Sequence, residues 1–119
     1  MLEMTQEQYV EALERLQYRV QYRSPPIEYA FTLCKNIYTQ TSNFAERNLS
    51  ITRETAVINL MLHQLDDLHE SIAAWEVENK PFCTNIPLYN QDLTTIKNKV
   101  AIDQEKCHDR LRFCTSLKY

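Results

Sequence analysis

The sequence of 119 residues contains no glycine. An average chain carries about 7% glycine, and glycine most readily adopts the positive φ angles of hairpin turns, strand bulges and helix C-caps. Its absence argues against a fold built on tight β-turns and favours helices. It also excludes the Walker-type phosphate loop and the dinucleotide-binding turn, because both need glycines where the backbone approaches phosphate.

Chain length, net charge and apolar runs restrict the class of protein further. A chain of this length favours one globular domain over residues 1–119. The net charge of −3, with acidic and basic residues interspersed, disfavours nucleic acid as a partner. The longest apolar run, residues 56–62, is too short to cross a bilayer. The first five residues lack a basic start and an apolar stretch, which predicts no signal peptide and a cytoplasmic location.

The four cysteines show no metal-type spacing. Cys34, Cys83, Cys107 and Cys114 contain no Cys-x-x-Cys pair. The last two would lie roughly 10 Å apart on a helix, whereas disulfides need Cα atoms within about 7 Å. We therefore expect reduced, partly buried thiols, and no motif for a bound cofactor is present.

Four helices are predicted, over about 5–23, 25–45, 52–79 and 90–116. The polar stretch 46–48 is predicted to be a turn, and residues 80–89 an irregular connector. Thr5 and Gln8 form a capping box at the first start. Ser24-Pro25-Pro26 ends that helix, and Ser24 is expected to cap the second with Pro25 in its first position.

The later helices are marked in the same way. Ser50 or Thr52 is expected to cap the third helix, with Glu54 complementing its N-terminal dipole. Asn90 is expected to cap the fourth, with Asp92 in its first turn. Val57, Leu60 and Leu62 widen the apolar stripe of the third helix, which predicts burial on most sides there.

Each predicted helix carries an apolar stripe at 3–4 residue spacing. The stripes are Leu2, Tyr9, Leu13, Leu16 and Val20; Ile27, Ala30, Cys34, Ile37, Thr41 and Phe44; Ile58, Met61, Leu65, Leu68, Ile72 and Trp75; and Leu93, Ile96, Val100, Cys107, Leu111 and Cys114. Such stripes favour near-parallel packing at about 20°. The sequence thus predicts an all-α, up-down-up-down four-helix bundle. The alternative is a dimer in which two hairpins from each chain complete the core.

A basic and aromatic stripe follows the end of the first helix. Arg15, Arg19 and Arg23 fall at i, i+4 and i+8, with Tyr18 and Tyr22 beside them. Arginine binds carboxylate or phosphate bidentately, and Arg and Tyr are enriched at interface hot spots. This stripe is the predicted binding site. The alternative is structural, because arginine near a helix C-terminus complements the dipole.

Acidic and histidine side chains offer a second candidate. His63, Asp67 and Glu70 fall at i, i+4 and i+7 on the third helix, a spacing that can ligate a divalent metal. However, no matching Glu-x-x-His lies on another helix, as a bundle di-metal site requires. A solvated face with an ordinary histidine is the alternative.

A separate hypothesis is a metal-dependent hydrolase of the all-α nucleotide pyrophosphohydrolase type, whose Mg²⁺ would lie between acidic residues of two helices. Those residues would be Glu7, Glu11 and Glu14 on helix one and Asp66, Asp67 and Glu70 on the third helix, but the paired Glu-x-x-Glu and Glu-x-x-Asp motifs of such enzymes are not both present.

The functional expectation is a non-enzymatic interaction protein that presents a helical face to a larger protein partner as adaptor, chaperone or inhibitor. Many small motif-free helical proteins are virus- or phage-encoded accessory factors, an association that would place this one in the host cytoplasm. The alternatives are a side-chain-based binder of a small anionic ligand such as a nucleotide, and the metal-dependent hydrolase. Homo-oligomers also remain open.

Overall fold

The computed structural model describes residues 3–40 and 43–117, with the side chains of 35–40 left undescribed. It contains α1 (Gln6–Arg23), α2 (Ile27–Gln40), α3 (Phe44–Asn79), a single 3₁₀ turn η1 (Lys80–Phe82) and α4 (Tyr89–Ser116). No strand occurs in the described ranges. The all-α prediction is confirmed.

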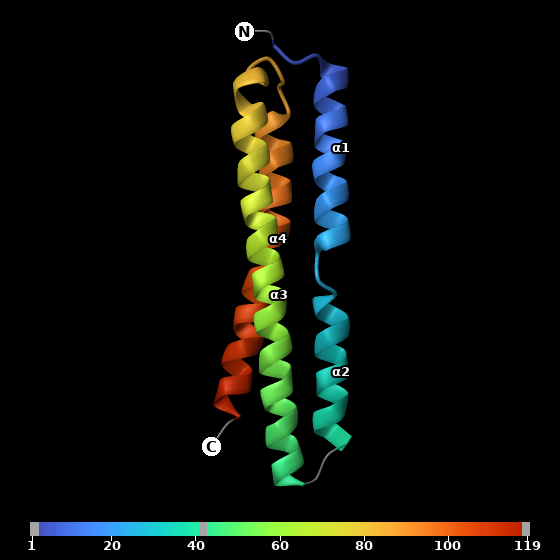
Figure 1. Ribbon diagram of the computed structural model, residues 1–119, viewed down its shortest axis with the longest axis vertical. Helices are drawn as coiled ribbons and strands as arrows, with labels where there is room; N and C mark the ends of the chain where they lie inside the picture. The colour runs from blue at the N-terminus through green and yellow to red at the C-terminus, as the bar shows by residue number, and fades with distance from the viewer. Residues whose placement is uncertain (1–2, 41–42, 118–119) are drawn as a thin grey trace. The chain divides into compact units, whose positions relative to one another are not determined.

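The chain divides into two compact units. The α1 unit comprises residues 1–24 and 66–101, and the α2 unit comprises 25–65 and 102–119. Over the described residues, each unit packs three α-helical segments: α1 or α2, a segment of α3 and a segment of α4. Within each unit the α3 segment runs antiparallel to the other two (Figure 1).

The expected four-helix, up-down-up-down bundle is therefore corrected to three-helix packing within each unit. The reason is length: α3 has 36 residues and α4 has 28, so each contributes a segment to both units. The single domain over 1–119 and the alternative of a core completed by a second copy stay predictions.

Local sequence signals fix both ends of α1 but not the start of α2. The Thr5–Gln8 capping box forms, with side-chain to backbone distances of 3.1 and 2.9 Å. Helix α1 ends at Arg23, as the two prolines require. Ser24 does not cap α2, since its N–H and hydroxyl both donate to the Val20 carbonyl at the end of α1. Helix α2 then begins at Ile27 rather than at residue 25.

The start of α3 was predicted eight residues too late. The helix begins at Phe44, and the Asn43 side-chain oxygen accepts from the backbone N–H groups of Ala45 and Glu46 at 2.8 and 3.3 Å. Ser50 and Thr52 lie within the helix. The polar stretch 46–48, predicted to be a turn, is part of α3, where most of its residues are exposed. The expected second helix to residue 45 is wrong, and the stripe positions Ile37 and Thr41 fall outside the described side chains.

Most of the predicted stripe residues form the core. Buried among them are Tyr9, Leu16, Val20, Ile27, Ile58, Met61, Leu65, Leu68, Ile72, Trp75, Leu93, Ile96, Val100, Cys107 and Cys114. Val57 and Leu60 are exposed, which contradicts the predicted burial of that half of α3 on most sides. No disulfide joins the four cysteines, all of which lie within the described ranges. Burial raises the pKa of the Cys107 thiol to about 11.

Three aromatic rings form the centre of the α1 unit. The Tyr89 ring stacks on Trp75 with centroids 6.0 Å apart and lies 6.3 Å from the Tyr9 ring. The Tyr9 hydroxyl donates to the Asp92 carboxylate at 2.5 Å. The buried Tyr89 hydroxyl has no hydrogen-bond partner among the described residues. Burial, then the nearby charges of Glu76 and Cys83, raise the pKa of Tyr89 to about 12.

This cluster predicts a loss of stability in alkali. Burial and the Asp92 carboxylate also raise the pKa of Tyr9 above its usual range. Both folded pKa values exceed the unfolded value of 10, so the stabilisation is complete below pH 10 and is lost as pH rises through the folded values. For Tyr89 the loss at pH 11 is about 1 kcal/mol.

Urea unfolding between pH 8 and 11.5 measures the effect. Tyr89→Phe should flatten the alkaline decline and leave stability at pH 8 unchanged or higher, because it removes a buried hydroxyl without a described partner. Tyr9→Phe should instead cost about 1–3 kcal/mol at pH 8, since Asp92 loses its donor. Equal losses in both variants at pH 8 would contradict this account.

Candidate functional site

The predicted binding stripe lies on the exposed side of α1. We call Arg15, Tyr18, Arg19, Tyr22 and Arg23 the Arg–Tyr stripe. Burial of Tyr9, Leu16 and Val20 fixes the rotation of α1 and leaves all five stripe residues exposed. Tyr18 and Tyr22 are 60% and 70% exposed. The structure thus brings the five predicted residues together on one surface.

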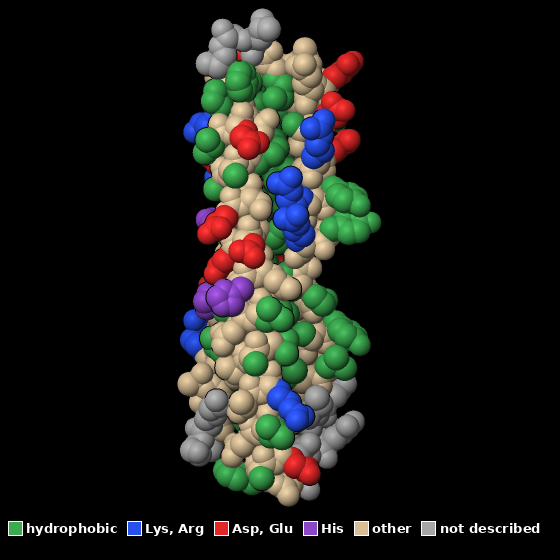
Figure 2. All heavy atoms as spheres, viewed as in Figure 1, with side chains coloured by type: hydrophobic (Ala, Val, Ile, Leu, Met, Phe, Trp, Pro, Cys, Tyr) green, Lys and Arg blue, Asp and Glu red, His purple; other side chains and the backbone are tan. Residues whose placement is uncertain are grey.

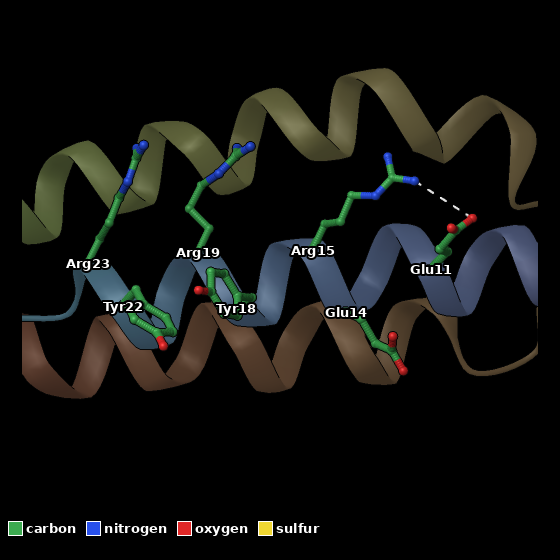
Figure 3. Close-up of a pocket in the computed structure, with 7 residues that line it drawn as sticks. All are labelled: Glu11, Glu14, Arg15, Tyr18, Arg19, Tyr22 and Arg23. Carbon is green, nitrogen blue, oxygen red and sulfur yellow. Dashed lines mark ion pairs between the residues drawn. The ribbon is translucent and has the colours of Figure 1, made fainter.

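The close-up of the stripe separates its basic and aromatic parts. The three arginine side chains extend to the same side of α1, and the two tyrosine rings lie together beside that row (Figure 3). The Tyr18 and Tyr22 ring centroids are 4.2 Å apart. Hydrogen bonding with Tyr22, more than burial, raises the pKa of Tyr18. The two rings therefore form one aromatic surface.

The arginines differ in their partners. Arg15 lies 3.7 Å from the Glu11 carboxylate, and both side chains are more than 70% exposed. Such an exposed pair contributes little to stability. The structure describes no ion pair for Arg19 or Arg23. Their charged groups are thus available to a carboxylate or phosphate supplied by another molecule.

The shape of the site is an open surface. A hollow of about 540 Å³ is lined by Glu11, Glu14 and the five stripe residues, all of which lie on α1. Because one helix supplies the whole lining, no second wall encloses a ligand. Figure 2 shows basic side chains in a row here, with acidic side chains nearby and hydrophobic side chains projecting next to it. Pockets for small molecules usually bury most of the ligand surface, which this hollow does not do.

The metal candidates are dispersed. His63, Asp67 and Glu70 are exposed, as are Glu7, Glu11 and Glu14. In the part of the chain that the structure describes, no group of three or more His, Cys, Asp or Glu side chains lies close enough to hold a metal ion. The spacing seen in the sequence is therefore not accompanied by a cluster.

Several basic side chains of α4 form ion pairs with acidic side chains of the same unit. Lys97 lies 2.7 Å from Glu76 of α3, and Lys106 lies 2.8 Å from Glu28 of α2. Arg112 pairs with Asp109 and Glu105 along the helix. Ion pairs of α4 therefore form both along the helix and with the neighbouring helices.

Sequence reasoning missed one buried charged pair in the α2 unit. Glu54 is 1% exposed and lies 2.5 Å from the Arg110 guanidinium, instead of complementing a helix N-terminus. The Arg110 guanidinium also lies 4.7 Å from the Phe113 ring centroid and 5.9 Å from that of Phe31. The sequence did contain a signal for this pair. Glu54 lies four residues before Ile58 and Arg110 lies three residues after Cys107, so helical spacing places both next to buried stripe residues.

Comparison of the chain with protein-family models, with curated proteins and with solved structures finds no match. Within the described residues, no helix is long and apolar enough to span a membrane.

Proposed function

We propose that this protein is a non-enzymatic interaction module that binds an acidic helical segment of a larger protein through the Arg–Tyr stripe. The observation that carries the proposal is that Arg19 and Arg23, which are exposed and have no described ion pair, lie beside two exposed tyrosines whose ring centroids are 4.2 Å apart. Residues four apart on a helix are separated by about 6 Å along the axis. Arg15, Arg19 and Arg23 therefore match carboxylates that repeat every four residues on a partner helix.

The tyrosines add contact area to this charge pattern. A tyrosine ring offers a large amphipathic surface with only two side-chain torsions to order. Contact between the Tyr18 and Tyr22 rings, which are tilted by 32° to each other, restrains both rings before binding and so lowers the entropy cost of docking. Arginine and tyrosine are also enriched among residues that dominate binding energy. An open surface on one helix suits a macromolecular partner better than a small ligand.

The proposal includes the role of adaptor, chaperone or inhibitor in the cytoplasm. Composition and the lack of an enzyme motif favour these roles. The proposal also includes a virus- or phage-encoded protein that acts in the host cytoplasm. A metal-dependent hydrolase is not proposed, because the described residues provide no cluster for the ion.

Peptide binding tests the proposal. The probe is an alanine-based helical peptide of about 20 residues with glutamates at i, i+4 and i+8, and the control peptide carries glutamine there. We expect the acidic peptide to bind in fluorescence anisotropy, with affinity falling as salt rises. Arg19→Glu should weaken binding at least about tenfold and Tyr22→Ala about fivefold.

The matched control is Lys80→Glu, which changes the net charge by the same amount at an exposed position of the α1 unit. It should weaken binding less than about twofold. Equal binding of the acidic and glutamine peptides, or equal loss in Arg19→Glu and Lys80→Glu, would contradict use of the stripe.

A small anionic ligand is the second candidate, supported by three arginines around one hollow of about 540 Å³. Nucleotides at millimolar concentration would then raise the melting temperature of the wild type by mass action. Arg19→Ala would abolish that shift. Peptide binding without a nucleotide shift favours the protein partner, and the reverse favours the small ligand.

A further inference from the structure

A second hollow opens on the α1 unit next to the Arg–Tyr stripe and measures about 630 Å³. Helix α1 contributes to its lining through Gln8, Glu11, Ala12 and Arg15. The rest of the lining consists of residues 3–5 together with Asn79 and Phe82. We call this cavity the N-terminal hollow. Because segments distant in sequence line it, it can surround more of a bound side chain than the single helix of the stripe can.

Hydrogen bonds hold the segment that precedes α1 against the 3₁₀ turn and the residues after it. The Met4 N–H donates to the Phe82 carbonyl at 2.8 Å. The Thr84 hydroxyl donates to the Glu3 carboxylate at 2.7 Å. The Asn85 side-chain amide donates to the Met4 carbonyl at 3.4 Å. This part of the lining is therefore in place before a ligand arrives, which lowers the entropy cost of binding.

Two side-chain amides of the lining are also held in place. The Gln8 side-chain oxygen accepts from the Thr5 N–H at 2.9 Å. The Asn79 side-chain nitrogen donates to the Trp75 carbonyl at 2.8 Å. These bonds leave the Gln8 nitrogen as a donor and the Asn79 oxygen as an acceptor for a bound molecule.

The lining combines apolar surface with charges of both signs. Its apolar residues, all half-buried, are Met4, Ala12 and Phe82. The carboxylates of Glu3 and Glu11 disfavour an acidic side chain in the hollow, and the Arg15 guanidinium disfavours a basic one. A neutral side chain with a large apolar surface and a hydrogen-bond donor fits this lining. Tryptophan has these properties, because its indole N–H only donates.

The N-terminal hollow and the arginine row lie along one side of α1. Four residues at spacings of three or four share this side, namely Gln8, Ala12, Arg15 and Arg19. Glu11 and Arg15 line both hollows. Figure 3 shows these two side chains at the end of the row that is nearer the start of α1. A helical segment that binds the stripe and continues past Arg15 therefore passes over the N-terminal hollow.

Distances along α1 place the tryptophan within the partner segment. Gln8 and Ala12 both precede Arg15, so the hollow is centred about five residues, or roughly 7 Å, before it. Four residues of a partner helix span about 6 Å, so the tryptophan is one such step from the carboxylate that meets Arg15. An antiparallel partner is favoured, because the positive end of its dipole then lies at the negative C-terminal end of α1. The tryptophan then follows the three acidic residues in the partner sequence.

We infer that the N-terminal hollow binds a tryptophan of the partner, four residues after the last of the three acidic residues that face the Arg–Tyr stripe. The inference rests on the proposed function, because it adds a neutral anchor to the acidic helical segment. The stripe then selects the charge of the partner, and the hollow selects the side chain that follows.

Fluorescence anisotropy with labelled, alanine-based helical peptides tests the inference. One peptide carries glutamates at i, i+4 and i+8, and a second adds tryptophan at i+12. We expect the second to bind at least about tenfold more tightly, as a buried aromatic anchor does. Tryptophan at i+10 points to the other side of the peptide and should improve binding less than about twofold. An equal gain from both tryptophan positions would overturn the inference.

Variants of the N-terminal hollow test the same site in the protein. Ala12→Phe fills the hollow and should remove most of the gain from tryptophan, while the affinity for the purely acidic peptide stays within about twofold. Ala73→Phe, at an exposed position of α3 in the same unit, is the matched control and should keep the gain. Phe82→Ala removes apolar lining and should lower the gain at least about threefold. Circular dichroism melting checks that each variant is folded.

The remaining outcomes separate this inference from the proposed function. Binding of the acidic peptide with no gain from tryptophan at i+12 would overturn the inference and leave the proposed function standing. A gain that survives both Ala12→Phe and Phe82→Ala would place the tryptophan elsewhere and would also overturn it. A larger gain from tryptophan four residues before the first glutamate would overturn the antiparallel direction. If none of the peptides binds, both proposals are overturned.

Discussion

Replacement of Glu54 by alanine is expected to lower the free energy of unfolding by about 3–5 kcal/mol, because it leaves the Arg110 charge mostly buried without its carboxylate. Glu54 is 1% exposed and the Arg110 side chain 19% exposed, so water can replace the lost carboxylate only in part. Domains of this size have a total stability of about 5–15 kcal/mol. The variant should therefore lose a substantial part of the stability of the protein.

Two comparisons separate this effect from a general sensitivity of the unit. The double variant Glu54→Leu/Arg110→Met removes both charges and keeps apolar volume, so it should recover most of the lost stability. Glu28→Ala breaks the exposed pair with Lys106 on the same unit and should cost less than about 1 kcal/mol. Urea unfolding followed by circular dichroism measures all three. A Glu54→Ala loss no larger than that of Glu28→Ala would refute the buried-pair account.

The second large effect is expected at Trp75, the single tryptophan of the chain. Its ring stacks on Tyr89 in the α1 unit, and its indole N–H donates to the Ala12 carbonyl at 3.1 Å. Trp75→Ala should cost about 3–5 kcal/mol, since it opens a cavity and removes the stacked partner. Trp75→Phe keeps an aromatic ring and should cost about 1–2 kcal/mol, through the lost indole hydrogen bond and the smaller ring.

The control for Trp75 is a substitution on the same helix outside the core. Val77→Ala changes a side chain that is 77% exposed and should alter stability by less than about 0.5 kcal/mol. Unfolding is followed by circular dichroism, because the variants lack the fluorescent indole. A Trp75→Ala cost below about 1 kcal/mol would mean that the ring does not organise the α1 unit.

Much of the candidate site followed from local sequence. The positions of Leu16 and Val20 define the buried side of α1, and residues 100° or more away from both, such as Tyr18 and Tyr22, are then expected to be exposed. The sequence also predicts the end of α1, because Pro25 and Pro26 cannot continue the helix. The sequence could not show that Arg19 has no described ion pair, because that depends on which side chains of other helices lie near it.

The errors have a common cause. The polar residues 46–48 were read as a turn because they interrupt an apolar pattern, yet a polar stretch is compatible with an exposed helix surface. Glu54 was assigned to a helix end by its charge, although it lies on the core stripe with Ile51 and Ile58. In both cases the position of a residue on the helix, and not its charge, decides whether it lies in the core or at the surface.

The sequence by itself determined the all-α class, most core stripes and the exposed stripe on α1. These depend on helical periodicity and on the lack of glycine, which are properties of short segments. Only the tertiary structure decided that three helical segments pack in each unit, that Glu54 meets Arg110, and that Val57 and Leu60 stay uncovered. Those outcomes depend on which helices become neighbours. A local period shows that a side of a helix is apolar, and only the packing shows whether another helix covers it.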